Sequence, residues 1–184
     1  MNRIPLVTPD TGDAGAAALL QDAEKTHGYV PNLYATLANA PAMLRGFLRF
    51  GMLLREAPTS ARPLRELIIM RCAQLSGAAY EWAHHWPLAI ESGVPERKLL
   101  ALSNWAAEDV FTDDERAVLD FAEQVHASGH VTDSTFARLR ERFDPEQIVE
   151  ITLTASFYAQ VARFLLAMDV QVEPEFRVYL DTWE

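Results

Sequence analysis

The fold of this chain is decided by residues 66–85, which read ELIIMRCAQLSGAAYEWAHH. The first half of this stretch is apolar nearly all the way round, which is typical of a helix that is buried on most sides. Gly77 interrupts the pattern, and residues 79–92 resume it as a second helix. The stretch therefore predicts a helical hairpin, two helices joined by a tight turn.

Three ionisable side chains of this hairpin are expected to meet. Glu81 and His85 are four residues apart, so they share one face of the second helix. Glu66 and His85 lie about 16 and 12 Å from the turn at Gly77, at about 1.5 Å per residue. An antiparallel hairpin then brings Glu66, Glu81 and His85 together in apolar surroundings, where such groups are costly unless they serve a purpose.

The composition restricts the class of protein. The chain has 184 residues, of which 49% are hydrophobic, and this suits one domain with a proper core. Its formal net charge is -10, whereas nucleic-acid binders usually carry a basic surface. We therefore expect no nucleic-acid partner.

Cysteine use and hydropathy suggest a cytoplasmic protein without a membrane partner. Cys72 is the single cysteine, which excludes an intramolecular disulfide, a CxxC redox pair and a zinc site built on several thiolates. The N-terminal residues show no signal-peptide pattern, and no run of eighteen apolar residues occurs.

The rest of the chain also favours helices. No strand pattern and no internal repeat stands out. We therefore predict an all-α fold with a single domain over residues 1–184, made of an N-terminal arm and helix (1–27), a core (28–173) and an aromatic tail (174–184). The expected helices are residues 14–26, 32–38, 42–55 (with Leu44, Phe47, Leu48, Met52 and Leu53 inward), a central helix after Ser60, then 79–92, 95–103, 113–128, 134–143 and 145–168.

The hairpin resembles the carboxymuconolactone decarboxylase and alkylhydroperoxidase D-like superfamily. The matching text is Arg65-Glu66-Leu67-Ile68-Ile69, Tyr80-Glu81-Trp82-x-x-His85, Gly28-x-x-Pro31-Asn32-Leu33 and Glu150 with Ser156-Phe157-Tyr158, within residues 28 to 173. The resemblance implies an alkylhydroperoxidase D-like helical bundle that assembles as a homo-oligomer, a trimer or a hexamer, with a small-molecule site on the hairpin. It also implies a decarboxylase-type chemistry that needs no metal and no organic cofactor.

One departure from the superfamily bears on the chemistry. In the peroxidase branch two cysteines precede the histidine by seven and four positions, and those positions hold Ala78 and Glu81 here. Without thiols there is no sulfur nucleophile to reduce a peroxide. The alkylhydroperoxidase-like alternative is therefore disfavoured, whereas the glutamate and the histidine agree with the decarboxylase branch.

The candidate catalytic residues are Glu66, Glu81 and His85. A carboxyl in an apolar site tends to a raised pKa, so Glu66 is expected to give a proton near neutral pH. The structural alternative is an ion pair with Arg71 or with another helix. His85 can both give and take a proton. Glu81 either orients His85 through an i,i+4 hydrogen bond or carries the proton itself.

Four further residues are candidates for substrate binding. Tyr80 and Trp82 are expected to wall the pocket, and Tyr158 and Arg163 to contact a carboxylated substrate. His84 points about 100° away from His85 and is expected at the surface or a subunit contact. Because adjacent histidines diverge on a helix, we predict no metal site.

These observations lead to three functional hypotheses. The first is a cofactor-free acid–base lyase or isomerase that acts on a small carboxylated lactone or a related ring compound. The second is a peroxidase, and the third is a non-catalytic oligomeric binder of a small molecule. The third would be favoured if Glu66 proved to be held in a salt bridge.

Overall fold

The computed structural model describes residues 2–11 and 13–183, and this part of the chain contains helices and no strand. Elements α1 to α9 are α-helices, and η1 and η2 are 3-10 helices. In chain order they are α1 (Ala14–His27), α2 (Asn32–Leu37), α3 (Pro41–Glu56), α4 (Arg62–Ser76), α5 (Ala79–Ser92), α6 (Glu96–Leu100), η1 (Leu102–Asn104), α7 (Asp113–Ser128), α8 (Asp133–Arg140), α9 (Pro145–Met168) and η2 (Pro174–Thr182). The prediction of an all-α fold is confirmed for the described residues.

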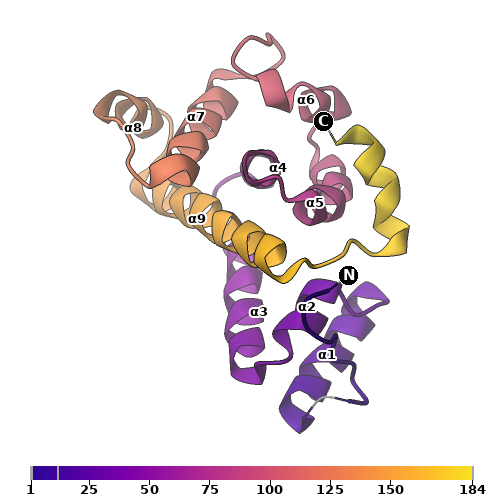
Figure 1. Ribbon diagram of the computed structural model, residues 1–184. Helices are drawn as coiled ribbons and strands as arrows, with labels where there is room; N and C mark the ends of the chain where they lie inside the picture. Colours follow the sequence, from indigo (N-terminus) through magenta and orange to yellow (C-terminus); the bar gives the residue numbers. More distant parts are fainter. Residues whose placement is uncertain (1, 12, 184) are drawn as a thin grey trace.

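Helix α4 lies at the centre of the molecule. It packs against α5, α7 and α9, and Figure 1 shows it nearly end-on with these helices around it. Helices α1 to α3 form a separate layer on the side of α9, and the C-terminal segment with η2 returns along α5. The sequence prediction of a helix buried on most sides is therefore correct for α4.

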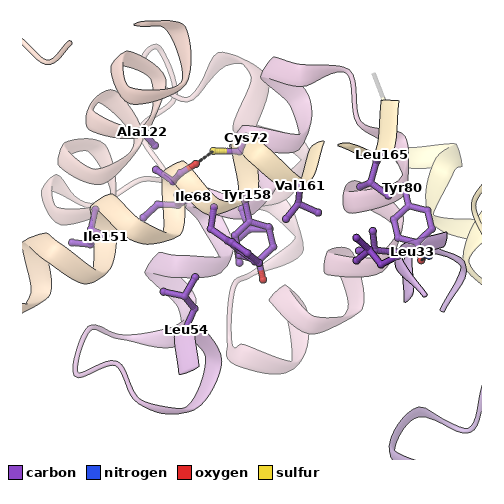
Figure 2. Close-up of a cluster of buried hydrophobic side chains, with 14 of the residues drawn as sticks. Leu33, Leu54, Ile68, Cys72, Tyr80, Ala122, Ile151, Tyr158, Val161 and Leu165 are labelled. Carbon is purple, nitrogen blue, oxygen red and sulfur yellow. Dashed lines mark hydrogen bonds between the residues drawn. The ribbon is translucent and has the colours of Figure 1, made fainter. Parts of the chain in front are cut away.

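Two hydrophobic clusters explain why α4 is apolar on opposite faces. Ile68 and Cys72 belong to the larger cluster with Tyr158 of α9, which Figure 2 shows in close-up. Leu67 and Met70 belong to the smaller cluster, which packs between α4, α5 and α7. A helix with one solvent-facing side would have needed only one apolar stripe.

Local sequence signals fix the helix ends. Gly77 ends α4 with a φ of 69°, a left-handed conformation that costs a residue with a Cβ more than glycine. Thr112 begins α7 with a capping box to Glu115, and Asp144 begins α9 in the same way. These short signals explain why the predicted bounds of α5, α7 and α9 agree with the structure.

The inward face of α3 differs from its prediction. Leu44 is buried and Phe47 is half-buried, but Met52 and Leu53 are 50% and 53% exposed. The buried positions continue at Gly51 and Leu54 instead. Gly51 carries no hydrophobic signal, yet it is buried beside the ring of Phe157, where an added Cβ would make an ordinary van der Waals contact.

Helix α9 is long and apolar enough to cross a membrane, by length and composition alone. Half of its apolar stretch is buried inside the molecule, where it packs against α4 and α7. A core helix passes the same test, so this feature is weak support for a membrane partner.

Candidate functional site

A cavity of about 460 Å³ lies beside α5, between α3, α9 and the C-terminal segment. This volume is within the range of small-molecule sites. Most of the wall is aromatic or aliphatic. The side chains with polar atoms that line it are Thr26, His27, Tyr29, Tyr34, Arg55, Arg62, Tyr80, Glu81, His84, His85 and Tyr158.

His85 is held by Glu66, which lies behind it on α4. The Nδ1 atom of His85 is 2.9 Å from Oε2 of Glu66, and the carboxyl of Glu66 is fully buried. Arg62, one helical turn before Glu66, forms an ion pair with its other oxygen. Burial alone would raise the pKa of Glu66, but His85 and then Arg62 outweigh it and lower the pKa below 4.5.

This arrangement corrects two expectations about Glu66. Its pKa is lowered rather than raised, so Glu66 is a carboxylate at neutral pH. Its ion-pair partner is Arg62 rather than Arg71, because Arg71 lies five residues on and points to a different side, where it pairs with Glu123.

Glu81 is the carboxyl with the raised pKa. It lines the cavity, is 3% exposed, and its Oε2 atom has no hydrogen-bond partner among the described residues. Burial raises the pKa of Glu81 well above 4.5. The expected i,i+4 hydrogen bond to His85 is absent from the contacts of the described residues, because Nδ1 of His85 is engaged by Glu66. Burial therefore favours the protonated form of Glu81 beside the cavity.

Tyr158 connects these groups. Its ring meets that of His85 edge-on, with centroids 5.0 Å apart. Burial raises the pKa of its hydroxyl, and the nearby charges of Glu66 and Glu81 raise it further. Glu66, Glu81, His85 and Tyr158 are thus brought together in the folded chain, as the hairpin pattern predicted for the first three.

The other predicted contact residues divide into two groups. Tyr80 lines the cavity, whereas Trp82 lies outside it, buried against Trp86 and Trp183. Arg163 is exposed and does not line the cavity either. It follows Tyr158 by five residues, so it projects from a different side of α9.

Arg55, which the sequence analysis did not identify, takes the place expected for Arg163. Its side chain lines the cavity and pairs with no carboxylate in the described part of the chain. Arg55 lies at the end of an amphipathic helix, where an arginine is ordinarily a surface residue, so no sequence signal marked it.

His84 was also misplaced by the sequence analysis. It lines the same cavity as His85, and its Nε2 atom is 2.6 Å from Oε2 of Glu173. Glu173, which is 5% exposed, also accepts hydrogen bonds from the Tyr80 hydroxyl and the Asn32 amide. Burial would raise the pKa of Glu173, but the hydrogen bonds from the His84 side chain and the Asn32 backbone N–H lower it. No local pattern links residues 84 and 173, which only the return of the C-terminal segment brings together.

The structure offers no support for a thiol mechanism. Cys72 is buried and its Sγ atom lies 3.8 Å from the carbonyl oxygen of Ala155 (Figure 2). Burial, followed by the charge of Glu81, raises the pKa of the Cys72 thiol to about 12.

Within the described residues no group of three or more histidine, cysteine, aspartate or glutamate side chains is placed to hold a metal ion.

Comparison with known proteins places the chain in a family. Residues 41–124 match the carboxymuconolactone decarboxylase family. The uncharacterized protein YdfG of Bacillus subtilis (strain 168) is 31% identical over 109 residues, which span 58% of this chain and 74% of YdfG. The uncharacterized protein YnjA of Escherichia coli (strain K12) is 32% identical over 82 residues, which span 44% of this chain and 45% of YnjA.

Solved structures show the same fold. An uncharacterized peroxidase-related protein with an alkylhydroperoxidase AhpD core from Ralstonia eutropha JMP134 superposes with a TM-score of 0.84 at 23% identity, over 97% of this chain and 95% of that one. A cysteine-to-alanine form of the debrominase Bmp8, in complex with 2,3,4-tribromopyrrole, gives a TM-score of 0.83 at 24% identity over the full length of both chains. These structures show that the chain has the AhpD-like fold. The family match and the 31% identical relative show that it belongs to the carboxymuconolactone decarboxylase family.

Proposed function

We propose that this protein is an acid–base enzyme, a lyase or isomerase of the carboxymuconolactone decarboxylase type, which acts on a small carboxylated lactone or a related ring compound. The observation that carries the proposal is the environment of Glu81, a buried carboxyl that lines the cavity four residues from His85 and whose Oε2 atom has no hydrogen-bond partner among the described residues. A buried acid without a partner costs stability, and such a cost is typical of a functional group.

His85 and Glu81 have complementary roles. The carboxylate of Glu66 accepts the Nδ1 proton of His85, which leaves the lone pair on Nε2 for the cavity. His85 is thus set up as a base. Burial favours the protonated form of Glu81, which is thus set up as an acid. A site with one base and one acid can move a proton between two atoms of a bound molecule.

The walls of the cavity fit a flat, anionic substrate. Tyr80, Phe157 and Tyr158 offer ring surfaces that pack well against a planar ring. Arg55 is a guanidinium without a carboxylate partner in the described part of the chain, and it can bind a substrate carboxylate through two hydrogen bonds. Debrominase Bmp8, which shares the fold, binds a small ring compound, 2,3,4-tribromopyrrole.

The proposed reaction balances without an added reagent. In a decarboxylation the bond between the ring carbon and the carboxylate breaks, and its electron pair moves to the conjugated carbonyl of the lactone, which forms an enolate. CO2 leaves, and Glu81 protonates the ring carbon. Glu81 then regains its proton from solvent through His85. In an isomerisation no CO2 leaves. His85 would take a proton from one ring carbon, and Glu81 would deliver a proton to another ring carbon.

NMR and CO2-release assays of a panel of unsaturated lactone carboxylates test this function. We expect CO2 release or double-bond migration with the unchanged protein, and a fall of about 10²–10⁴-fold in Glu81→Gln and His85→Gln, the usual contribution of an acid–base group. His130→Gln, which changes an exposed histidine outside the cavity, is the matched control and should keep full turnover. Full turnover in both Glu81→Gln and His85→Gln would contradict the assignment.

A small-molecule binder is the second candidate, because Glu66 is held in an ion pair with Arg62. A pocket of this kind would bind the same lactones without changing them. Calorimetric binding of the panel together with unchanged NMR spectra over a day would favour the binder over the enzyme.

The chain is also proposed to act as a homo-oligomer, a trimer or a hexamer, in the cytoplasm. Exposed apolar side chains on α3 and α9 support this assembly, because a monomer would leave them in water. These side chains are Met43, Phe50, Met52, Leu53, Val149 and Leu153. Sedimentation analysis of the full chain measures the assembly, and a single monomeric species would contradict it.

A further inference from the structure

The outer part of the cavity contains a second histidine–carboxylate pair that the proposed acid–base chemistry does not use. His84 donates from Nε2 to Glu173, which leaves Nδ1 as the acceptor nitrogen. The Tyr29 hydroxyl lies 3.5 Å from this Nδ1 atom, and both Tyr29 and His84 line the cavity.

The ring of His84 is accessible only at its edge. Tyr80 stacks on one face, with centroids 4.2 Å apart, and Phe176 stacks on the other at 4.1 Å. A ligand can therefore reach the imidazole only at its edge, where the two nitrogen atoms are the polar atoms. Glu173 occupies Nε2, so Nδ1 is the atom that remains.

The contact between Tyr29 and His84 is long, so both groups can also bind a third polar atom that approaches from the cavity. A distance of 3.5 Å is at the long end of hydrogen bonding, so this contact holds neither group firmly. A ligand oxygen beside the pair can accept a hydrogen bond from the Tyr29 hydroxyl and donate one to Nδ1 of His84. A hydroxyl group does both, whereas a methyl group does neither.

We propose that Tyr29 and His84, with Glu173 as the positioning residue behind them, form a binding subsite for a hydroxyl group of the substrate. The substrate class becomes a hydroxylated, planar ring carboxylate, with its carboxylate at Arg55 and its hydroxyl at Tyr29 and His84. The inference deepens the proposed function and rests on it for the ring carboxylate, but the subsite itself binds without a chemical step.

Binding measurements with simple aromatic acids test the subsite. The probes are 2-, 3- and 4-hydroxybenzoate, each compared by calorimetry with the methylbenzoate of the same substitution. We expect one hydroxybenzoate to bind about tenfold more tightly than its methyl counterpart, which corresponds to about 1.4 kcal/mol. In Tyr29→Phe and His84→Gln that preference should fall below about threefold, while the affinity for the methylbenzoate stays the same.

Controls make the result specific. Tyr179→Phe removes a tyrosine hydroxyl outside the cavity and should keep the full preference. If His84→Gln does not fold because Glu173 loses its partner, Tyr29→Phe decides the test alone, since it removes one half-buried hydroxyl and leaves the ring.

The outcomes separate this inference from the proposed function. A hydroxyl preference that is lost in Tyr29→Phe supports the subsite, even if Glu81→Gln and His85→Gln show no effect on turnover. The absence of any preference in the unchanged protein, or a preference that Tyr29→Phe retains, overturns the subsite whatever the turnover assays show.

Discussion

Glu66 and Glu81 lie on the two helices of one hairpin, both close enough to Tyr158 to raise the pKa of its hydroxyl, yet their own pKa values move in opposite directions. Arg62 forms an ion pair with Glu66 and His85 donates a hydrogen bond to it, whereas Glu81 has only burial to set its pKa. The surroundings therefore favour the ionised form of Glu66 and the protonated form of Glu81, and such a divergence is typical of carboxyls with separate roles.

Glu81→Gln should raise stability at neutral pH. The folded-state pKa of Glu81 is above 4.5, so as pH rises past 4.5 the unfolded chain ionises first and stability falls. Glutamine does not ionise, so the variant does not lose stability in this way as the pH rises. We expect the melting temperature at pH 7 to rise by a few degrees, since about 1 kcal/mol moves it by about 2–4 °C for a chain of this size.

Calorimetry at pH 7 and at pH 4 checks this prediction. The gain should shrink at pH 4, where the unfolded carboxyl is largely protonated as well. Glu24→Gln, at an exposed position on α1, is the control and should change little. A variant that is less stable than the unchanged protein at pH 7 would show that Glu81 is ionised.

Glu66→Gln should have the opposite effect on stability. The pKa of Glu66 is lowered in the folded state, so its contribution is present above pH 4.5 and is lost as pH falls below that value. We expect a loss of about 1–3 kcal/mol at pH 7, because Arg62 and His85 each lose a charged partner. Urea unfolding at pH 7 and pH 3 measures it, and an equal loss at both values would argue against a carboxylate at this position.

Cys72→Ala should leave any peroxide consumption unchanged. The buried thiol has a pKa of about 12 and is almost wholly protonated at neutral pH, so it is a poor nucleophile. We also expect the thiol reagent DTNB to label the native protein slowly and the guanidinium-unfolded protein at once. Rapid labelling of the native chain, or peroxide consumption that disappears in Cys72→Ala, would restore the peroxidase hypothesis.

Gly77→Ala should destabilise the hairpin by about 1–2 kcal/mol, the cost of a left-handed conformation for a residue with a Cβ. An added Cβ meets nothing within 4 Å there, so the cost comes from the backbone alone. Gly46→Ala in α3 is a matched control, because it also has open space but a helical backbone. It should stabilise the fold by about 0.5–1 kcal/mol. Urea unfolding that gave both changes the same sign would contradict the role of Gly77.

The sequence by itself determined the features that depend on neighbours along the chain. The hydrophobic pattern predicted α4 as a buried helix, Gly77 predicted the turn, and the capping signals of Thr112 and Asp144 predicted where α7 and α9 begin. The four-residue spacing of Glu81 and His85 placed both at one cavity. All of these rest on helical geometry over a few residues, which does not need the rest of the fold.

The tertiary structure decided what depends on distant partners. The pKa of Glu81 could not be predicted, because it follows from the absence of a partner among the described residues that pack around it. His84 joins the cavity because Glu173, 89 residues away, returns beside α5 to bind it. Arg55 replaces Arg163 because the side of α9 that carries Arg163 faces out. Charge state and cavity lining are set by which segments meet in space, and the hydrophobic pattern of one segment carries no record of the polar atoms that its neighbours present.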